Sequence, residues 1–213
     1  MSAKVEEYRG RSITIRFDGS KCIHSRFCVL GQPGVFRANV DGPWIDPDAA
    51  DPDRIAEVAH RCPSGAITYE RHDTRPAESP PEVNTARVLE NGPMALHGEL
   101  VLDGEPIGTR ATLCRCGRSG NMPFCDGSHS AAKFEATGEP PTAESKPLAS
   151  CGGPLEITPF PNGPVGVKGN LEVIAGTGRT VQRTTNAALC RCGASSNKPF
   201  CDGSHSKIGF TTE

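Results

Sequence analysis

The sequence predicts an α+β protein with one small mixed domain followed by two β-rich repeats. In the first part, residues 12–17 alternate apolar and polar side chains, the period of a half-buried strand. Asp51-Pro52-Asp53 is typical of a helix start, with a capping side chain and Pro at the first helical position. Further along, one Cys-rich motif occurs twice, each time after short alternating runs. A motif repeated with its flanking strands indicates a repeated domain.

The composition indicates small hydrophobic cores. Only 36% of the 213 residues are hydrophobic and 5% are aromatic, whereas the chain has 24 Gly and 19 Pro. Small cores are commonly reinforced by metals or disulfides. The net charge of −2 gives no reason to expect nucleic acid or a membrane as the main partner.

The ten Cys residues are predicted to be metal ligands in a reducing compartment. No apolar stretch approaches the length of a membrane span, and the start of the chain lacks the apolar run of a signal peptide. We therefore expect a cytoplasmic protein. Cysteines there are more often metal ligands than disulfide partners. Cys151, which has no counterpart in the repeat, is expected to be a small buried residue or an idle thiol.

Two polar, Pro-rich stretches divide the chain into domains. The first domain is expected to contain a strand at 12–17, a helix at 53–60 and a closing strand at 66–69. The predicted order is a domain at 1–75, a linker at 76–90, a repeat at 91–138, a linker at 139–153 and a repeat at 154–213. Strands are expected in the repeats at 97–102, 109–113, 168–174 and 180–189.

Each copy of the motif supplies three thiols and one imidazole. The candidate ligands are Cys114, Cys116, Cys125 and His129 in the first copy and Cys190, Cys192, Cys201 and His205 in the second. Thiolates with one imidazole suit zinc or an iron–sulfur cluster, and not magnesium or calcium. Because Cys125 and His129 are four residues apart, a helical turn would place them on one face. Spacing alone leaves zinc and iron–sulfur equally open.

Other residues of the motif have two interpretations each. The Gly that follows the second Cys allows backbone to pass close to a bulky centre. Four side chains either tune the metal centre or merely cap turns: Ser119, Ser195, Asp126 and Asp202. Two further side chains either offset the charge of the centre or are simply solvated: Arg115 and Arg191.

The pattern Cys-x-Cys-x2-Ser-x3-Pro-x-Cys-Asp-Gly-Ser-His resembles the CDGSH iron–sulfur domain, and the match is complete in both copies. The resemblance implies a [2Fe–2S] cluster in each copy, with three Cys ligands and one His. It places Cys114 and Cys116 on one iron and Cys125 and His129 on the other, and the same roles carry over to the second copy. Members with one copy form dimers with an intertwined β-cap. Two copies in tandem imply a monomer that makes this pseudo-dimer internally.

The first domain carries a weaker signal. Cys22 and Cys28, with the distant Cys62 before a Pro, resemble a divergent mono-cluster [4Fe–4S] ferredoxin domain, a type often fused to CDGSH domains. The usual middle Cys is replaced by Ser25, and His24 lies one residue earlier. Three Cys alone suit [3Fe–4S], whereas His24 or a non-protein ligand would permit [4Fe–4S]. The alternative is a domain without a cluster and with three buried thiols.

These sites predict a carrier rather than an enzyme. No phosphate-binding Gly loop, Ser/His/Asp order or paired carboxylates stand out in the sequence. We expect one-electron transfer or cluster storage and delivery, with a redox protein or an apo-acceptor as partner. One alternative is a regulator that senses redox state or pH through cluster loss, because a protonated His cannot ligate. Another is a zinc-stabilised interaction module.

Overall fold

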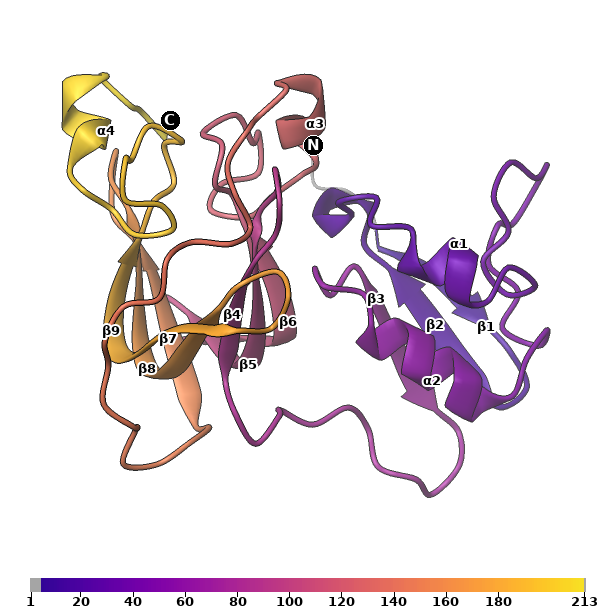
Figure 1. Ribbon diagram of the computed structural model, residues 1–213. Helices are drawn as coiled ribbons and strands as arrows, with labels where there is room; N and C mark the ends of the chain where they lie inside the picture. The colour runs from indigo at the N-terminus through magenta and orange to yellow at the C-terminus, as the bar shows by residue number, and fades with distance from the viewer. Residues whose placement is uncertain (1–4, 213) are drawn as a thin grey trace. The chain divides into compact units, whose positions relative to one another are not determined.

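The computed structural model describes residues 5–212 and divides into two compact units, Met1–Ser79 (unit 1) and Pro80–Glu213 (unit 2) (Figure 1). Both units combine strands with short helices, so the predicted α+β class is confirmed. Across the described residues, none of the helices has the length and apolar character needed to cross a membrane.

Unit 1 contains a three-stranded antiparallel sheet. Its order is β1 (Glu6–Arg9), β2 (Ile13–Phe17) and β3 (Ile67–Arg71). The central and closing strands lie where the alternating pattern predicts them. β1 has no such pattern, because it is an edge strand whose side chains are mostly charged and exposed.

Two short helices, α1 (Phe27–Gly31) and α2 (Pro52–His60), cover one face of this sheet (Figure 1). A 3₁₀ helix, η1 (Gly19–Lys21), follows β2. α2 starts as predicted, since the Asp51 carboxylate accepts a hydrogen bond of 2.9 Å from the Asp53 N–H. Its apolar face contributes Ile55, Val58 and Ala59 to the core of the unit, with Ile13 and Ile15 from the sheet.

Unit 2 is built from two β-hairpins and two shorter strands that connect them. The hairpins are β5 (Met94–Leu102) with β6 (Glu105–Leu113), and β8 (Val165–Ile174) with β9 (Thr180–Leu189). β4 (Thr85–Val88) pairs antiparallel with β5 and parallel with β8. β7 (Pro154–Pro159) pairs parallel with β5 and antiparallel with β8. The two repeats therefore share one sheet.

A single hydrophobic core lies within this sheet. It draws equivalent side chains from both repeats, among them Leu96, Leu100, Val167 and Leu171, each no more than 1% exposed. Neither repeat could bury this apolar surface alone, because each supplies only about half of it. The repeats depend on each other for stability.

One predicted boundary is corrected. Residues 85–88, which were assigned to the first linker, form β4 and pair with both hairpins. The segment is short and preceded by a Pro-rich stretch, so nothing local distinguishes it from a linker. Its strand conformation is stabilised by partners that are distant in the sequence.

Two short helices follow the strands of unit 2 and carry part of the Cys-rich motifs. They are α3 (Ser128–Ala131) and α4 (Ser204–Lys207), which lie beyond the same end of the sheet (Figure 1). The candidate centres of the two repeats are therefore at one end of unit 2.

Candidate metal centres

Strand pairing brings the two halves of each Cys-rich motif together. In the first repeat, the N–H of Cys114 donates to the Pro123 carbonyl and the N–H of Cys125 donates to the Thr112 carbonyl, both at 2.8 Å. The chain thus folds back on the end of β6, which sets Cys125 beside the Cys114 segment. The second repeat makes the same two bonds, with Cys190 to Pro199 and Cys201 to Ala188, each at 2.8 Å.

A helical turn then brings the His to the third Cys. Gly127, with φ of 88°, begins α3, and the left-handed backbone there turns the chain toward Cys125. The Nδ1 atom of His129 lies 3.3 Å from the Cys125 Sγ. Gly203, with φ of 84°, and α4 give the same arrangement in the second repeat.

The four predicted ligands of each repeat thus form two pairs. The Sγ atoms are 3.7 Å apart in Cys114–Cys116 and 3.8 Å apart in Cys190–Cys192, and the Sγ–Nδ1 distance is 3.3 Å in both Cys125–His129 and Cys201–His205. Two sulfurs bound tetrahedrally to one metal at about 2.3 Å lie about 3.8 Å apart. Each Cys–Cys pair therefore has the spacing of two ligands on one metal ion.

The pairs do not merge into one four-ligand site. Among residues 5–212, no three Cys, His, Asp or Glu side chains converge on the position of a single ion. Each repeat presents one Cys–Cys pair and one Cys–His pair. That arrangement fits a centre with two metal ions.

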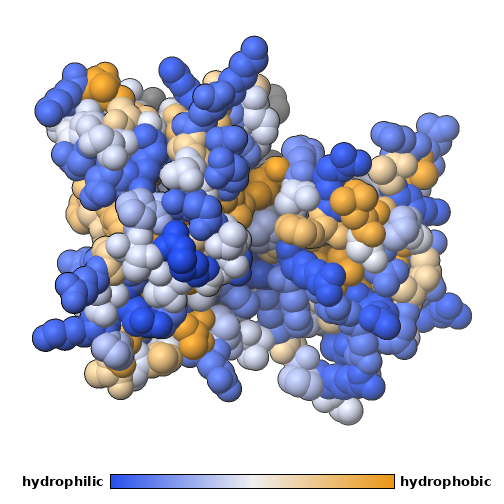
Figure 2. All heavy atoms as spheres, in the orientation of Figure 1, coloured by the Kyte–Doolittle hydropathy of each residue, from blue (hydrophilic) through white to orange (hydrophobic). Residues whose placement is uncertain are grey.

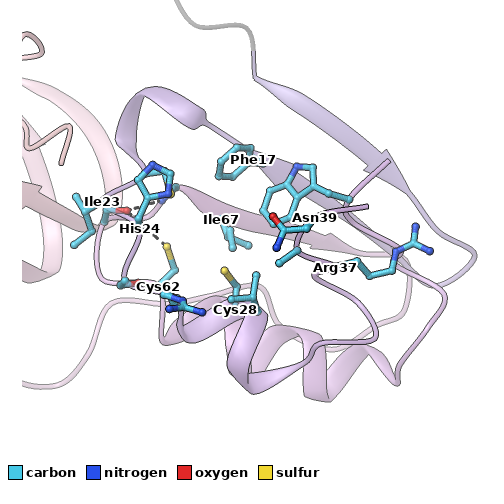
Figure 3. Close-up of a pocket in the computed structure, with 16 residues that line it drawn as sticks. Phe17, Ile23, His24, Cys28, Arg37, Asn39, Cys62 and Ile67 are labelled. Carbon is cyan, nitrogen blue, oxygen red and sulfur yellow. Dashed lines mark hydrogen bonds between the residues drawn. The ribbon is translucent and has the colours of Figure 1, made fainter. Parts of the chain in front are cut away.

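Unit 1 brings its three Cys and His24 to one cavity of about 540 Å³ (Figure 3). Cys28 comes from α1, Cys62 follows α2, and the Cys22 Sγ lies 4.0 Å from the His24 Nδ1. Phe17, Trp44 and Ile67 are among the apolar side chains of the wall. Thiols gathered in a largely apolar cavity suit an iron–sulfur cluster.

The backbone turns sharply where His24 enters this cavity. Both His24 (φ 54°) and Arg26 (φ 65°) adopt the left-handed conformation, which is uncommon for residues other than Gly. Burial raises the pKa of Cys22 and of Cys28, so these thiols remain protonated until a metal binds. All four predicted ligands line the cavity, with the three Cys half-buried and His24 exposed.

Two family models match the chain. "Iron-binding zinc finger CDGSH type" matches residues 91–130 and 162–206, and "Divergent 4Fe-4S mono-cluster" matches residues 8–72. The uncharacterized protein YjdI of Escherichia coli K12 is 40% identical over 65 residues, which are 30% of this chain and 83% of that protein.

Two CDGSH domains and one divergent 4Fe-4S mono-cluster domain thus make up most of the chain.

Its other similar relatives include CDGSH iron-sulfur domain-containing protein 1 of Rattus norvegicus and of Bos taurus. Each matches the chain over 65 residues, 30% of this chain. The identity is 32% for the rat protein and 34% for the bovine protein. The chain spans 56% and 58% of their lengths, a little over half. The two CDGSH repeats and the divergent 4Fe-4S domain of unit 1 are therefore iron–sulfur-binding domains.

In the first repeat, Cys114 and Cys116 are hydrogen-bonded to each other. A hydrogen bond from Cys116 lowers the pKa of Cys114 to about 6, helped by backbone N–H groups of the loop, and the same bond raises the pKa of Cys116. Burial raises the pKa of Cys125 to about 11. In the second repeat, burial raises the pKa of Cys190. Thiols of both repeats therefore lose protons as they bind a metal.

The Ser and Asp side chains of the CDGSH motif act as turn caps. The carboxylate of Asp126 accepts from the N–H groups of Gly120 (2.8 Å) and Ser128 (3.0 Å), which ties the loop after Cys116 to the start of α3. The Ser119 hydroxyl donates to the Phe124 carbonyl at 2.6 Å. The second repeat uses Asp202 and Ser195 in the same way. Of the two interpretations, these bonds support turn capping.

Arg115 and Arg191 are buried, so the solvated interpretation of these side chains is wrong. Arg115 is 1% exposed and Arg191 is 3% exposed. The Arg115 guanidinium donates to backbone carbonyls before and after the hairpin, those of Leu89, Gly92, Ala136 and Thr137. Arg191 likewise donates to Phe160 and Gly163. In both copies the Arg lies between two candidate Cys ligands in the sequence. This repeated position is the sequence signal that could have predicted the buried role of the two arginines.

Cys151 takes no part in these centres. Its side chain is exposed, so the prediction of a small buried residue is wrong and the idle thiol remains.

Proposed function

We propose that each CDGSH repeat holds one [2Fe–2S] cluster with three Cys ligands and one His. The observation that carries this proposal is that each repeat presents a Cys–Cys pair and a Cys–His pair. Two adjacent pairs suit two irons better than one zinc ion. Cys114 and Cys116 would bind one iron, and Cys125 and His129 the other. The second repeat supplies the equivalent set.

We further propose a third cluster in unit 1, of the [4Fe–4S] type, with Cys22, Cys28, Cys62 and His24 as ligands. The shared cavity and the 4.0 Å distance between the His24 Nδ1 and the Cys22 Sγ support this assignment. If His24 does not ligate, three Cys would hold a [3Fe–4S] centre.

In this proposal the chain is a carrier of electrons or clusters and not an enzyme. When bound, the clusters supply one-electron chemistry. The residues of the chain hold them, limit the access of water and set their charge. A neutral imidazole in place of a thiolate removes one negative charge from the ligand set, which favours the reduced state of a [2Fe–2S] centre.

The partner would be a redox protein or an apo-protein that accepts a cluster. Figure 2 shows apolar surface on unit 1 in the region of α1. Phe27 and Leu30 of this helix are 52% and 71% exposed, and Cys28 lies between them. An apolar surface beside a cluster ligand suits transient docking of a protein partner.

The repeats would act as a monomer with an internal pseudo-dimer, capped by β-structure. The reciprocal pairing of β4 and β7 with both hairpins supports this arrangement. We place the protein in the cytoplasm, since its ten free cysteines suit a reducing compartment.

A second candidate function is a sensor that signals through cluster loss. It is favoured by the single His in each repeat, because acidification competes directly for that ligand. Both functions require the same clusters. A carrier passes an electron or a cluster to its partner, whereas a sensor passes a signal when its cluster is lost.

Iron and acid-labile sulfide content with a visible spectrum, on protein purified without oxygen, tests the cluster proposal. We expect seven or eight irons per chain, that is, two for each [2Fe–2S] cluster and three or four for the centre of unit 1. A zinc-containing protein without sulfide would overturn it and support an interaction module. Cluster transfer to an apo-ferredoxin, compared with reduction by a reductase, then separates delivery from electron transfer.

A further inference from the structure

In each CDGSH repeat, the backbone at the second Cys ligand and the following Gly lies against the corresponding Cys-Gly segment of the other repeat. Gly117 follows Cys116 with φ of +76°, and a Cβ added to it would lie 2.6 Å from the Cys192 carbonyl oxygen. Gly193 follows Cys192 with φ of +81°, and a Cβ there would lie 2.7 Å from the Cys116 carbonyl oxygen. Side-chain carbons do not approach backbone this closely, so only glycine fits at either position. The contact is reciprocal.

This contact changes the interpretation of the two glycines. The sequence predicts that they give backbone room beside a bulky centre. Instead, Gly117 makes room for the Cys192 peptide, and Gly193 for the Cys116 peptide. The neighbour that excludes a side chain is the other repeat's ligand segment.

We propose that the contacts between Cys116-Gly117 and Cys192-Gly193 couple the two cluster sites, so that loss of one cluster shortens the lifetime of the other. This inference rests on the proposed presence of a cluster in each repeat. A bound iron fixes the backbone of its Cys ligand. When that iron is lost, the segment moves, and its neighbour is backbone with no flexible side chain to absorb the movement. The movement therefore reaches a ligand of the second cluster.

A matched pair of glycine substitutions in the second repeat tests this coupling. The full-length chain would carry His129→Cys, which makes the first cluster all-thiolate and distinguishes its absorption and paramagnetic resonance spectra from those of the second. Gly193→Ala places a Cβ against Cys116. Gly203→Ala is the control. Gly203 has a similar φ of +84° and also lies near ligands of the second repeat, but a Cβ added to it would have no neighbouring atom within 4 Å.

We expect Gly193→Ala to shorten the lifetime of the first-repeat cluster by about fivefold or more, the lower range of coupling between linked sites. Gly203→Ala places no atom against the first repeat, so the first-repeat cluster should keep its parent lifetime for as long as the second cluster stays bound. If Gly193→Ala leaves the first cluster unchanged, or if the two variants shorten its lifetime equally while the second cluster is bound, the coupling is overturned.

A second variant leaves both glycines in place. Cys201→Ser removes an outer ligand of the second cluster, and we expect the first cluster then to be lost faster than in the parent chain. An unchanged rate would contradict the proposal. Absence of iron and sulfide from the parent chain would instead contradict the proposed function, so the two failures are distinguishable.

Discussion

The guanidinium carbon of Arg115 lies 5.5 Å from the centre of the Phe134 ring, and Arg191 repeats this contact with Phe210 at 5.8 Å. Each arginine thus lies between an aromatic ring and a set of backbone carbonyls. A guanidinium donates in several directions from one plane, which a lysine cannot do. The Arg between the two Cys ligands therefore connects the ligand loop to the segments before and after it.

We expect Arg115→Lys to destabilise unit 2 by about 2–3 kcal/mol, because buried carbonyls lose their donor. Arg118→Lys is a suitable control, since this neighbouring side chain is exposed and should change stability by no more than about 0.5 kcal/mol. Denaturant unfolding, followed by circular dichroism at equal cluster content, measures both. Equal effects of the two substitutions would show that the buried hydrogen bonds contribute little.

Mild acid should release the clusters of the CDGSH repeats, and His129→Cys with His205→Cys should slow that release. Only the neutral imidazole ligates, so a falling pH favours the unbound, protonated His. Burial lowers the pKa of His129, which preserves the neutral form to a lower pH than in water and shifts the onset of its protonation downward. The decay of visible absorbance from pH 8 to pH 5 measures the effect. Acid lability that is the same in the double variant would exclude the imidazoles as its cause.

The carboxylates of the same loops titrate in a different range. Burial raises the pKa of Asp126, but hydrogen bonds from Ser128 and Gly120 outweigh this and lower it overall. A carboxylate whose folded pKa is lowered stabilises the fold above its unfolded pKa, about 4, and this contribution is lost as pH falls further. Cluster loss between pH 7 and pH 5 therefore reports on the imidazoles and not on Asp126.

His24→Ala should remove about one iron from the centre of unit 1 and leave a [3Fe–4S] cluster, since three Cys remain. Paramagnetic resonance of the oxidised protein detects that product, and iron analysis counts the loss. His60→Ala changes a His of α2 that is not among the cavity-lining residues, and should preserve the iron content. An unaltered centre in His24→Ala would leave Cys22, Cys28 and Cys62 as its protein ligands.

Asp51→Ala should destabilise unit 1 by about 1 kcal/mol, because the N–H of Asp53 loses its cap. Asp51→Asn should retain most of the stability, since an amide oxygen caps a helix nearly as well. Trp44 is the single Trp of the chain and packs against Phe17 at 4.9 Å, so its fluorescence follows the unfolding of unit 1. If both substitutions cost the same, the cap is not the cause.

The sequence by itself determined the candidate ligands and most of the strands. Cys114, Cys116, Cys125 and His129 are close in the chain, and local spacing decides which of them pair. The strand at 12–17 was predictable because its apolar and polar residues alternate, and the strand at 180–189 because it leads into the second Cys-rich motif as 109–113 leads into the first.

The tertiary structure alone decided how the repeats share their sheet and what surrounds the ligands. In the sequence, β4 resembles a linker, and in the structure it pairs with β5 and β8. Arg115 likewise resembles a surface residue in the sequence, whereas in the structure it donates to four backbone carbonyls. The contact of Gly117 with Cys192 has no local signal, because its partner lies in the other repeat. Short-range patterns specify which groups can bind a metal. Which backbone segments meet depends on burying one core between two repeats, and that is a property of the whole fold.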